Sequence, residues 1–126
     1  MALRGTEDQD GVGRGVTSKR PSDLLQGTLD LLVLKALARH PMHGYSVMRW
    51  LRQTSDDGLK IEEGALYPAL HRIEAKGWVE AEWGLSESNR QAKFYALTRE
   101  GRRQLEVETT SWKSYVEAVG KILAAA

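Results

Sequence analysis

The chain has 126 residues, a size typical of one domain that buries its own core or shares one with a second copy. Its 18 Lys and Arg against 17 Asp and Glu leave a net charge of +1, so any attraction for a polyanion must come from local charge. No Cys is present, which excludes disulfides, thiolate metal sites and a cysteine nucleophile and is typical of a cytoplasmic protein. The longest purely apolar run, residues 31–34, is far shorter than the roughly 20 residues of a membrane span, and no apolar leader opens the chain. We therefore expect no membrane partner.

Residues 1–21 are predicted to be a disordered tail. Glycines and charges of both signs alternate there with almost no large apolar side chains. The cations of the tail suit a basic arm that contacts DNA phosphates. The alternative is a simple extension, which the composition favours because Glu7, Asp8 and Asp10 offset most of the charge.

The next segment predicts two helices, since its apolar residues recur at spacings of three and four. Helix one begins after Pro21, with Ser22 or Asp23 as its cap, and ends before Pro41, which cannot continue a helical hydrogen-bond ladder. Helix two is expected over residues 44–53.

A third helix is predicted over residues 63–76, closed by Gly77 in the left-handed conformation. Pro68 is expected near its first turn, where a missing N–H costs little. A narrow apolar stripe of Leu66, Leu70 and Ile73 should pack inward. The opposite face then presents small, aromatic and basic residues able to enter a major groove, namely Ala65, Tyr67, Pro68, Ala69, His71 and Arg72.

After Gly77 the period changes to two, and residues 78–83 and 93–97 alternate as half-buried strands. They predict a β-hairpin with a long, polar and flexible tip over residues 84–92. Lys60 and Ile61 can add an edge strand to this hairpin. The sequence thus predicts a mainly α fold with a small β-hairpin.

A last helix is predicted to start after Thr98 as its N-cap, with Gly101 at the third helical position, and to run almost to the C-terminus. Its apolar residues follow coiled-coil spacing, and so small a body offers little surface to cover them. A second copy of the chain is the economical partner. The expected dimer interface consists of Leu105, Trp112, Tyr115, Val116, Val119, Ile122 and Leu123.

Three blocks together resemble the PadR family of transcriptional regulators, in its short form with a single C-terminal dimerisation helix. They are His43-Gly-Tyr, Glu63-Gly-Ala-Leu-Tyr-Pro-Ala-Leu-His-Arg-Ile-Glu with Gly77 and Val79, and Lys93-Phe-Tyr-Ala-Leu-Thr with Gly101. The resemblance extends over about residues 24–123. It implies a winged helix-turn-helix homodimer that binds a palindromic operator and usually represses transcription, with release by an effector in some members. Residues 22–98 would form the DNA-binding domain and residues 99–126 the dimerisation helix.

Double-stranded DNA is therefore the expected partner. For three of the expected contact residues, a structural role is the alternative to DNA contact. Tyr67 can instead pack on the second helix, Tyr45 can fill a gap between helices, and Arg72 can pair with Glu74 on its own helix. The expected contact residues are His43, Tyr45, Ala65, Tyr67, Pro68, His71, Arg72, Asn89, Arg90, Gln91 and Lys93.

The hairpin tip carries a local charge that the whole-chain value conceals. Residues 86–103 hold five cations and two acids, a net +3, which suits the minor groove or flanking phosphates. The tip departs from the run of adjacent basic residues usual in the family, because Glu87, Ser88 and Gln91 dilute it. We therefore expect weaker affinity through this hairpin.

Trp112 raises the question of a small-molecule effector. In multidrug-binding PadR-like regulators a tryptophan of the C-terminal helix lines a pore at the dimer centre, and two Trp112 indoles could stack a flat aromatic ligand between them. The alternative is plain interface core. Trp50, Trp78 and Trp83 are expected to be packing residues.

Two other classes of function are alternatives to DNA binding. The three His residues lack metal-ligand spacing and the chain has no phosphate-binding glycine loop or nucleophile elbow, so neither an enzyme, a cofactor nor a metal is expected. A winged-helix protein-interaction adaptor without DNA binding is favoured by the diluted hairpin tip and the near-neutral charge. Duplex binding that weakens steeply with salt would distinguish the regulator from the adaptor.

Overall fold

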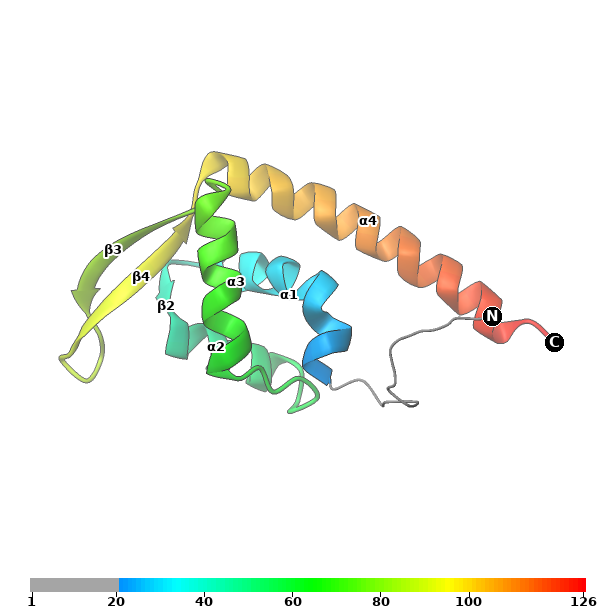
Figure 1. The fold of residues 1–126 in the computed structure, drawn as a ribbon, viewed down its shortest axis with the longest axis horizontal. Coiled ribbons are helices and arrows are strands. Elements are labelled where there is room, and N and C mark those ends of the chain that lie inside the picture. The colour runs from blue at the N-terminus through cyan, green and yellow to red at the C-terminus, as the bar shows by residue number, and fades with distance from the viewer. Residues whose placement is uncertain (1–20) are drawn as a thin grey trace, which may run out of the picture.

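The computed structural model describes the backbone from residue 21 and the side chains from residue 28, both to the C-terminus. The predicted disordered tail, with its basic arm, falls on residues outside the described part of the chain, apart from Pro21. The elements in chain order are α1 (Pro21–Leu37), β2 (Met42–His43), α2 (Gly44–Thr54), α3 (Glu63–Ala75), β3 (Val79–Leu85), β4 (Gln91–Leu97) and α4 (Arg99–Ala124). A mainly helical fold with one small sheet is thus confirmed (Figure 1).

α1 is the helix around which the body is assembled. It packs against α2, α3, β4 and the start of α4. Its Val33 and Leu34 are fully buried, and so are Val47 of α2 and Leu66 of α3. Burial of each such side chain contributes roughly 1.5–3 kcal/mol, so these contacts fix the relative positions of the three helices. The helix begins at Pro21, which places the expected caps Ser22 and Asp23 inside its first turn.

α3 buries one face and exposes the other, with two corrections to the prediction. Leu66, Leu70 and Ile73 are fully buried as expected, but Ala69 is buried beside them and belongs to the inner face. Pro68 lies within the helix, in the second turn, where its ring removes a hydrogen bond to the carbonyl of Gly64. That carbonyl belongs to an exposed residue, so water can satisfy it.

The sheet has three antiparallel strands in the order β2-β4-β3. Its third strand is Met42–His43, paired with Tyr95 and Phe94 of β4, and not Lys60 with Ile61 as expected. Two residues carry no readable period, which is why the sequence did not reveal this strand.

The hairpin tip is also shorter than predicted, because β3 continues to Leu85 and β4 begins at Gln91. Only residues 86–90 form the turn. Ser86 N donates to Arg90 O at 2.8 Å and Asn89 N donates to Ser86 O at 2.9 Å. Asn89 has φ 62°, a left-handed conformation that asparagine tolerates better than most residues. The tip is therefore a compact, hydrogen-bonded turn.

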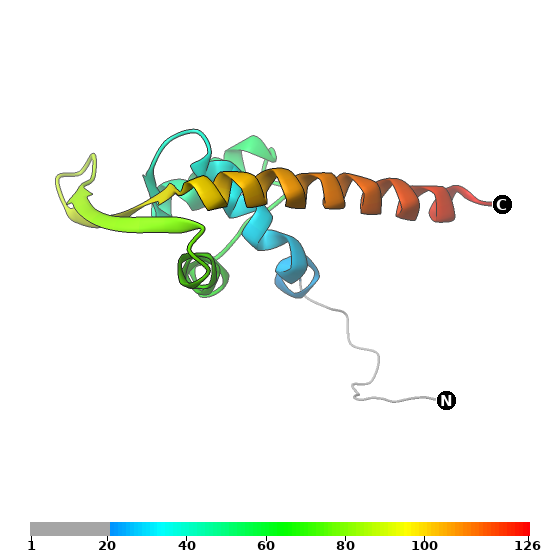
Figure 2. The same ribbon diagram turned by 90° about the horizontal axis from the view of Figure 1, so that it is seen from above.

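α4 starts at a tightly packed joint and then leaves the body. The Thr98 hydroxyl accepts from Gly101 N at 3.0 Å and donates to Gly77 O at 2.7 Å, which confirms the predicted N-cap. Gly77 has φ 79°, the predicted left-handed conformation after α3. Leu105 packs against the core, whereas most of the large apolar residues farther along are exposed and Val119 is half-buried. The hairpin and the far end of α4 point to opposite ends of the molecule (Figures 1 and 2).

None of the helices in the described part of the chain is both long and apolar enough to cross a bilayer.

Candidate nucleic-acid interface

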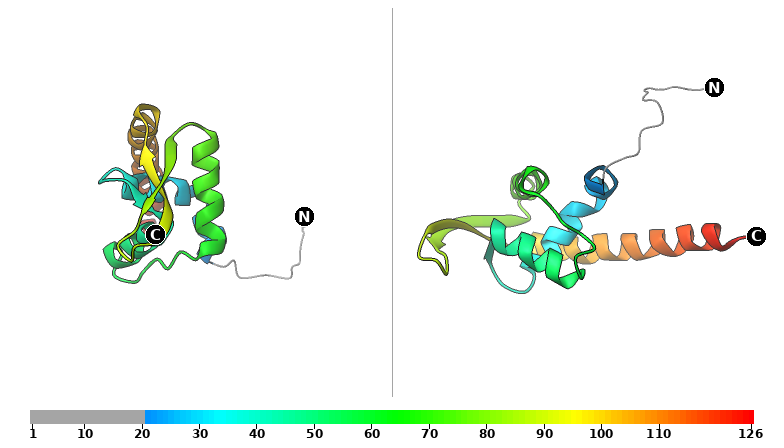
Figure 3. Two further views of the ribbon diagram at one scale, coloured as in Figure 1. Left: turned by 90° about the vertical axis from the view of Figure 1, so that its left-hand side faces the viewer. Right: turned by 90° about the horizontal axis from the view of Figure 1, so that it is seen from below.

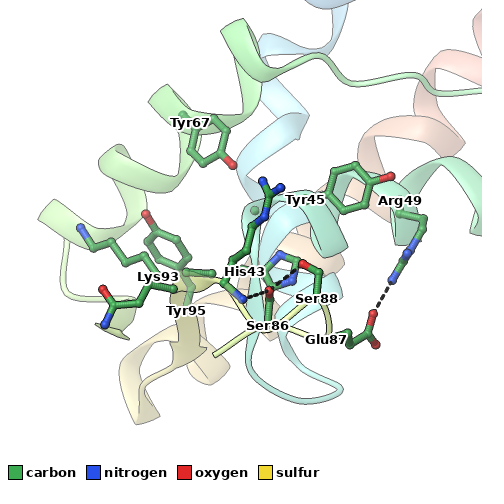
Figure 4. A pocket seen from close by; sticks show the side chains of 13 residues that line it. His43, Tyr45, Arg49, Tyr67, Ser86, Glu87, Ser88, Lys93 and Tyr95 are labelled. Carbon is green, nitrogen blue, oxygen red and sulfur yellow. Dashed lines mark hydrogen bonds and ion pairs between the residues drawn. The ribbon is translucent and has the colours of Figure 1, made fainter. Parts of the chain in front are cut away.

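α2, α3 and the hairpin surround an open hollow of about 660 Å³ (Figure 4). α3 stands beside the hairpin, and the two pack through β3 (Figures 1 and 3). Six of the predicted DNA contacts line this hollow, drawn from segments far apart in the sequence. The lining residues are His43, Gly44, Tyr45, Arg49, Tyr67, Ser86, Glu87, Ser88, Arg90, Gln91, Ala92, Lys93 and Tyr95.

Tyr67 reaches the hollow from α3 by crossing the start of α2. Gly44 makes this possible, since a Cβ at that position would lie 2.7 Å from Tyr67 Cε1 and Cζ. Burial of the ring, with a smaller contribution from Glu63, raises the pKa of Tyr67. The phenol therefore stays protonated at neutral pH and can donate a hydrogen bond. The Tyr67 ring packs against α2 while its hydroxyl faces the hollow (Figure 4). Packing on the second helix and contact with DNA are therefore compatible roles for this residue.

Tyr95 is a hollow residue that sequence reasoning did not include. It is buried in β4, and burial, followed by Glu74 and Tyr67, raises its pKa. Lys93 Nζ lies 5.8 Å from the centre of the Tyr95 ring and 3.9 Å from Glu74 Oε1. The charge of Lys93 is therefore shared with an acid of α3. Alternation along β4, which puts Tyr95 on the same face as Lys93, was the signal available in the sequence.

His43 has a structural role at the start of α2. Its Nδ1 accepts from Ser46 N at 3.3 Å, and Nε2 lies 3.3 Å from the Ser46 hydroxyl. Its ring meets Phe94 edge-on, with 5.3 Å between the ring centres. The imidazole thus caps α2 and joins it to the sheet, and its contact with DNA stays a prediction.

Tyr45 does not fill a gap between helices, because 59% of it is exposed. The guanidinium of Arg49, one turn later on α2, lies 5.5 Å from the centre of the Tyr45 ring. Arg49 also lies 3.8 Å from Glu87 of the hairpin tip, measured between Nη2 and Oε1. Arg49 lines the hollow but was not predicted. Arg49 follows Tyr45 by four residues and so lies on the same exposed face of α2, which was the signal available in the sequence.

Apart from Tyr67, the predicted contacts of α3 lie outside the hollow. Pro68 and His71 are exposed, whereas Ala65 is half-buried and packs against the core. Arg72 pairs with Asp30 of α1, not with Glu74, through Nη2–Oδ1 at 2.8 Å and Nε–Oδ2 at 3.3 Å. The side-chain hydrogen bond to Asp30 raises the pKa of Arg72. This bidentate pair fastens α3 to α1, and a DNA contact by Arg72 stays a prediction.

At the hairpin tip, Asn89, Arg90 and Gln91 are exposed. Arg90 and Gln91 line the hollow, whereas Asn89 does not. The left-handed backbone of Asn89 shapes the turn that places Arg90 and Gln91 at the hollow.

The four tryptophans divide into two pairs. Trp50 and Trp78 pack against the core, each beneath a cation, Arg39 and Lys76 respectively. Trp83 is 66% exposed, so its prediction as a packing residue is wrong. Trp112 is exposed on α4, and its ring centre lies 6.0 Å from that of Tyr115.

Within the described residues, no group of three or more His, Asp or Glu side chains could hold a metal ion.

A helix pair with one open face, followed by a two-stranded hairpin, defines a winged helix-turn-helix protein. The family model of the transcriptional regulator PadR-like family matches residues 33–107. The chain belongs to this family. The predicted fold and family are therefore both confirmed.

Solved structures support the assignment, and two curated proteins of uncharacterised function are also similar to the chain. A transcriptional regulator from Clostridium thermocellum is 25% identical with a TM-score of 0.72, over 79% of this chain and 96% of that one. A PadR family transcriptional regulator from Eggerthella lenta is 36% identical with a TM-score of 0.69, over 82% of this chain and 88% of that one. An uncharacterised protein from Lysinibacillus sphaericus is 26% identical over 98 residues, 78% of this chain and 90% of that one. A 37.1 kDa transposon protein from Streptomyces fradiae is 44% identical over 81 residues, 64% of this chain but 22% of its own length.

Proposed function

We propose that this regulator acts in the cytoplasm as a homodimer that binds a palindromic operator and represses transcription. One observation carries the proposal. α3 buries one face completely and leaves the opposite face open, beside a hollow lined by tyrosine hydroxyls and cations. A duplex needs such an arrangement, with one helix for base edges and fixed donors for phosphates.

The proposed contacts follow from where the side chains lie. The exposed Pro68 and His71 of α3 face the major groove. Tyr67 and Tyr45 donate to phosphate oxygens, and Arg90 with Gln91 reaches the minor groove or its phosphates. In a twofold dimer the two α3 helices would enter major grooves about one helical turn apart, roughly 34 Å.

The proposed dimer is supported by the uncovered apolar face of α4. Val107, Trp112, Tyr115 and Val116 are all exposed, and water disfavours a patch of this kind. Pairing of two α4 helices would cover it. Trp112 and Tyr115 would then offer aromatic surface to a flat effector, and this effector site is supported only by the family resemblance and by that exposure.

Fluorescence anisotropy on fragments selected from genomic DNA tests the proposal directly. Wild-type protein should bind a selected duplex with an affinity that falls steeply as salt rises. Tyr67→Phe keeps the ring against α2 but removes the donor, and it should weaken binding about tenfold. Thr110→Val, which removes a hydroxyl from an exposed position of α4 outside the proposed interface, should leave binding unchanged. Absence of duplex binding at low salt would support the adaptor instead.

Sedimentation tests the dimer separately. Trp112→Glu places two carboxylates in the proposed interface and should give a monomer. Lys113→Glu introduces the same acid at the neighbouring exposed position and should remain a dimer. A wild-type monomer at every concentration, or a dimer that survives Trp112→Glu, would refute the interface.

A further inference from the structure

The tip of the hairpin is joined to α2 by one ion pair across the hollow. Arg49 Nη2 lies 3.8 Å from Glu87 Oε1, and Figure 4 shows the two side chains reaching toward each other. The pair connects the helix-turn-helix unit to the turn that would approach a minor groove. Both groups are therefore within the surface proposed to meet DNA.

Arg49 is suited to bind a phosphate. It lines the hollow, and its guanidinium lies 5.5 Å from the centre of the exposed Tyr45 ring. A guanidinium offers a planar fork of donors that matches two phosphate oxygens, and stacking on an aromatic ring limits its motion. In the free protein these donors face the carboxylate of Glu87.

The backbone holds Glu87 at the tip, and its side chain is mostly exposed to solvent. The turn is closed by the pairing of Ser86 with Arg90 and by the left-handed Asn89. The Glu87 side chain is 88% exposed, against 46% for Arg49. An exposed ion pair of this kind is weak because water screens both charges, so a phosphate can displace the carboxylate.

We infer that Glu87 occupies, in the free protein, the position of a DNA phosphate at Arg49, and so lowers the affinity of the hollow for every duplex. This inference rests on the proposed function. Binding must separate the pair and bring the Glu87 carboxylate close to the sugar-phosphate backbone, where like charges repel. Glu87 is thus an affinity-determining residue, and Arg49 is the phosphate ligand that it masks.

Replacement of the Glu87 carboxylate by a DNA phosphate at Arg49 predicts how three variants should bind DNA. Glu87→Gln frees Arg49 and removes one negative charge from the interface, so affinity should rise about threefold at moderate salt. The plot of log affinity against log salt should steepen by less than the roughly 0.9 of a whole phosphate contact, because binding no longer releases a carboxylate that takes up a cation. Arg49→Gln should weaken binding, and more so when Glu87 has already been replaced.

Glu82→Gln is the matched control. It removes the same charge from the same hairpin, but Glu82 lies on the opposite face of the sheet from Lys93 and is exposed away from the hollow. We expect its affinity and salt slope to remain close to those of the wild type. Circular dichroism would verify that each variant folds.

The inference is overturned if Glu87→Gln binds DNA no more tightly than the wild type or than Glu82→Gln. It is also overturned if the effects of Arg49→Gln and Glu87→Gln simply add. Those outcomes leave the proposed function intact, because wild-type binding with a steep salt dependence is measured in the same series. If no variant binds any duplex, both the inference and the proposed function fail.

Discussion

The body of the molecule, formed by α1, α2, α3 and the sheet, buries its apolar side chains, whereas the far half of α4 leaves similar side chains exposed. Leu70 of α3 is 0% exposed, whereas Leu123 of α4 is 80% exposed, although both lie on amphipathic helices. The body covers its stripe with α1, α2 and the sheet, and the far half of α4 has none of these beside it (Figure 2). An apolar stripe in a sequence therefore indicates which face of a helix is to be buried, but not whether the same chain or a second molecule buries it.

The largest expected effect comes from truncating a leucine on each side of this comparison. Leu70→Ala opens a cavity in the body and should lower the free energy of unfolding by about 2–5 kcal/mol, measured by urea denaturation. Leu123→Ala should cost less than about 0.5 kcal/mol in protein dilute enough to be monomeric. Equal losses in the two variants would mean that this part of α4 packs on its own body.

An intermediate effect is expected from two glycines of the same helix. A Cβ at Gly101 would collide with the carbonyl oxygen of Trp78, whereas nothing lies within 4 Å of a Cβ at Gly120. Gly101→Ala should destabilise the protein by about 1–3 kcal/mol, because the backbone must shift. Gly120→Ala should stabilise it by about 0.5–1 kcal/mol through better helix propensity. Thermal unfolding of both variants measures the contrast, and a neutral Gly101→Ala would show that the joint is loose.

The smallest effect concerns an exposed ion pair at the start of α4. Arg103 contacts Glu100 at 3.2 Å through Nε, and this bond, followed by that of Gln104, lowers the pKa of Glu100 below its ordinary 4.5. A lowered pKa in the folded state contributes stability above the unfolded value, and that stability is lost as pH falls through the folded value. Glu100→Gln should therefore melt slightly below the wild type at neutral pH.

The difference in melting temperature between these two proteins should shrink as pH falls below 4.5 and through the lowered pKa of Glu100, because its carboxylate then becomes protonated. A difference that stays constant from neutral to acid pH would show that the charge of Glu100 plays no part.

Much of the fold could be predicted from the sequence, because the helical signals are long and their ends carry recognisable residues. α2 begins at Gly44 and α3 at Glu63, as the apolar spacing indicates, and Thr98 caps α4. The strand Met42–His43 could not be predicted, since only its pairing with β4 makes it a strand.

The candidate site was harder to predict, because its geometry depends on contacts between distant segments. Asp30 and Arg72 are 42 residues apart, and local reasoning offered Glu74 as the partner instead. Arg49 and Glu87 meet only because the hairpin folds toward α2. Residue types along a helix indicate which side chains can act, whereas their partners are set by tertiary packing.

Thr98 joins three elements at one point. Its N–H donates to Trp78 O at 3.0 Å, and its hydroxyl links Gly77 to Gly101. Thr98, together with Gly77 and Trp78 between α3 and β3, thus sets the direction in which α4 leaves. The far half of α4 can consequently change in length or composition during evolution without disturbing α2, α3 or the hairpin. In the proposed dimer, operators with different half-site separations become accessible through changes in that half of one helix alone.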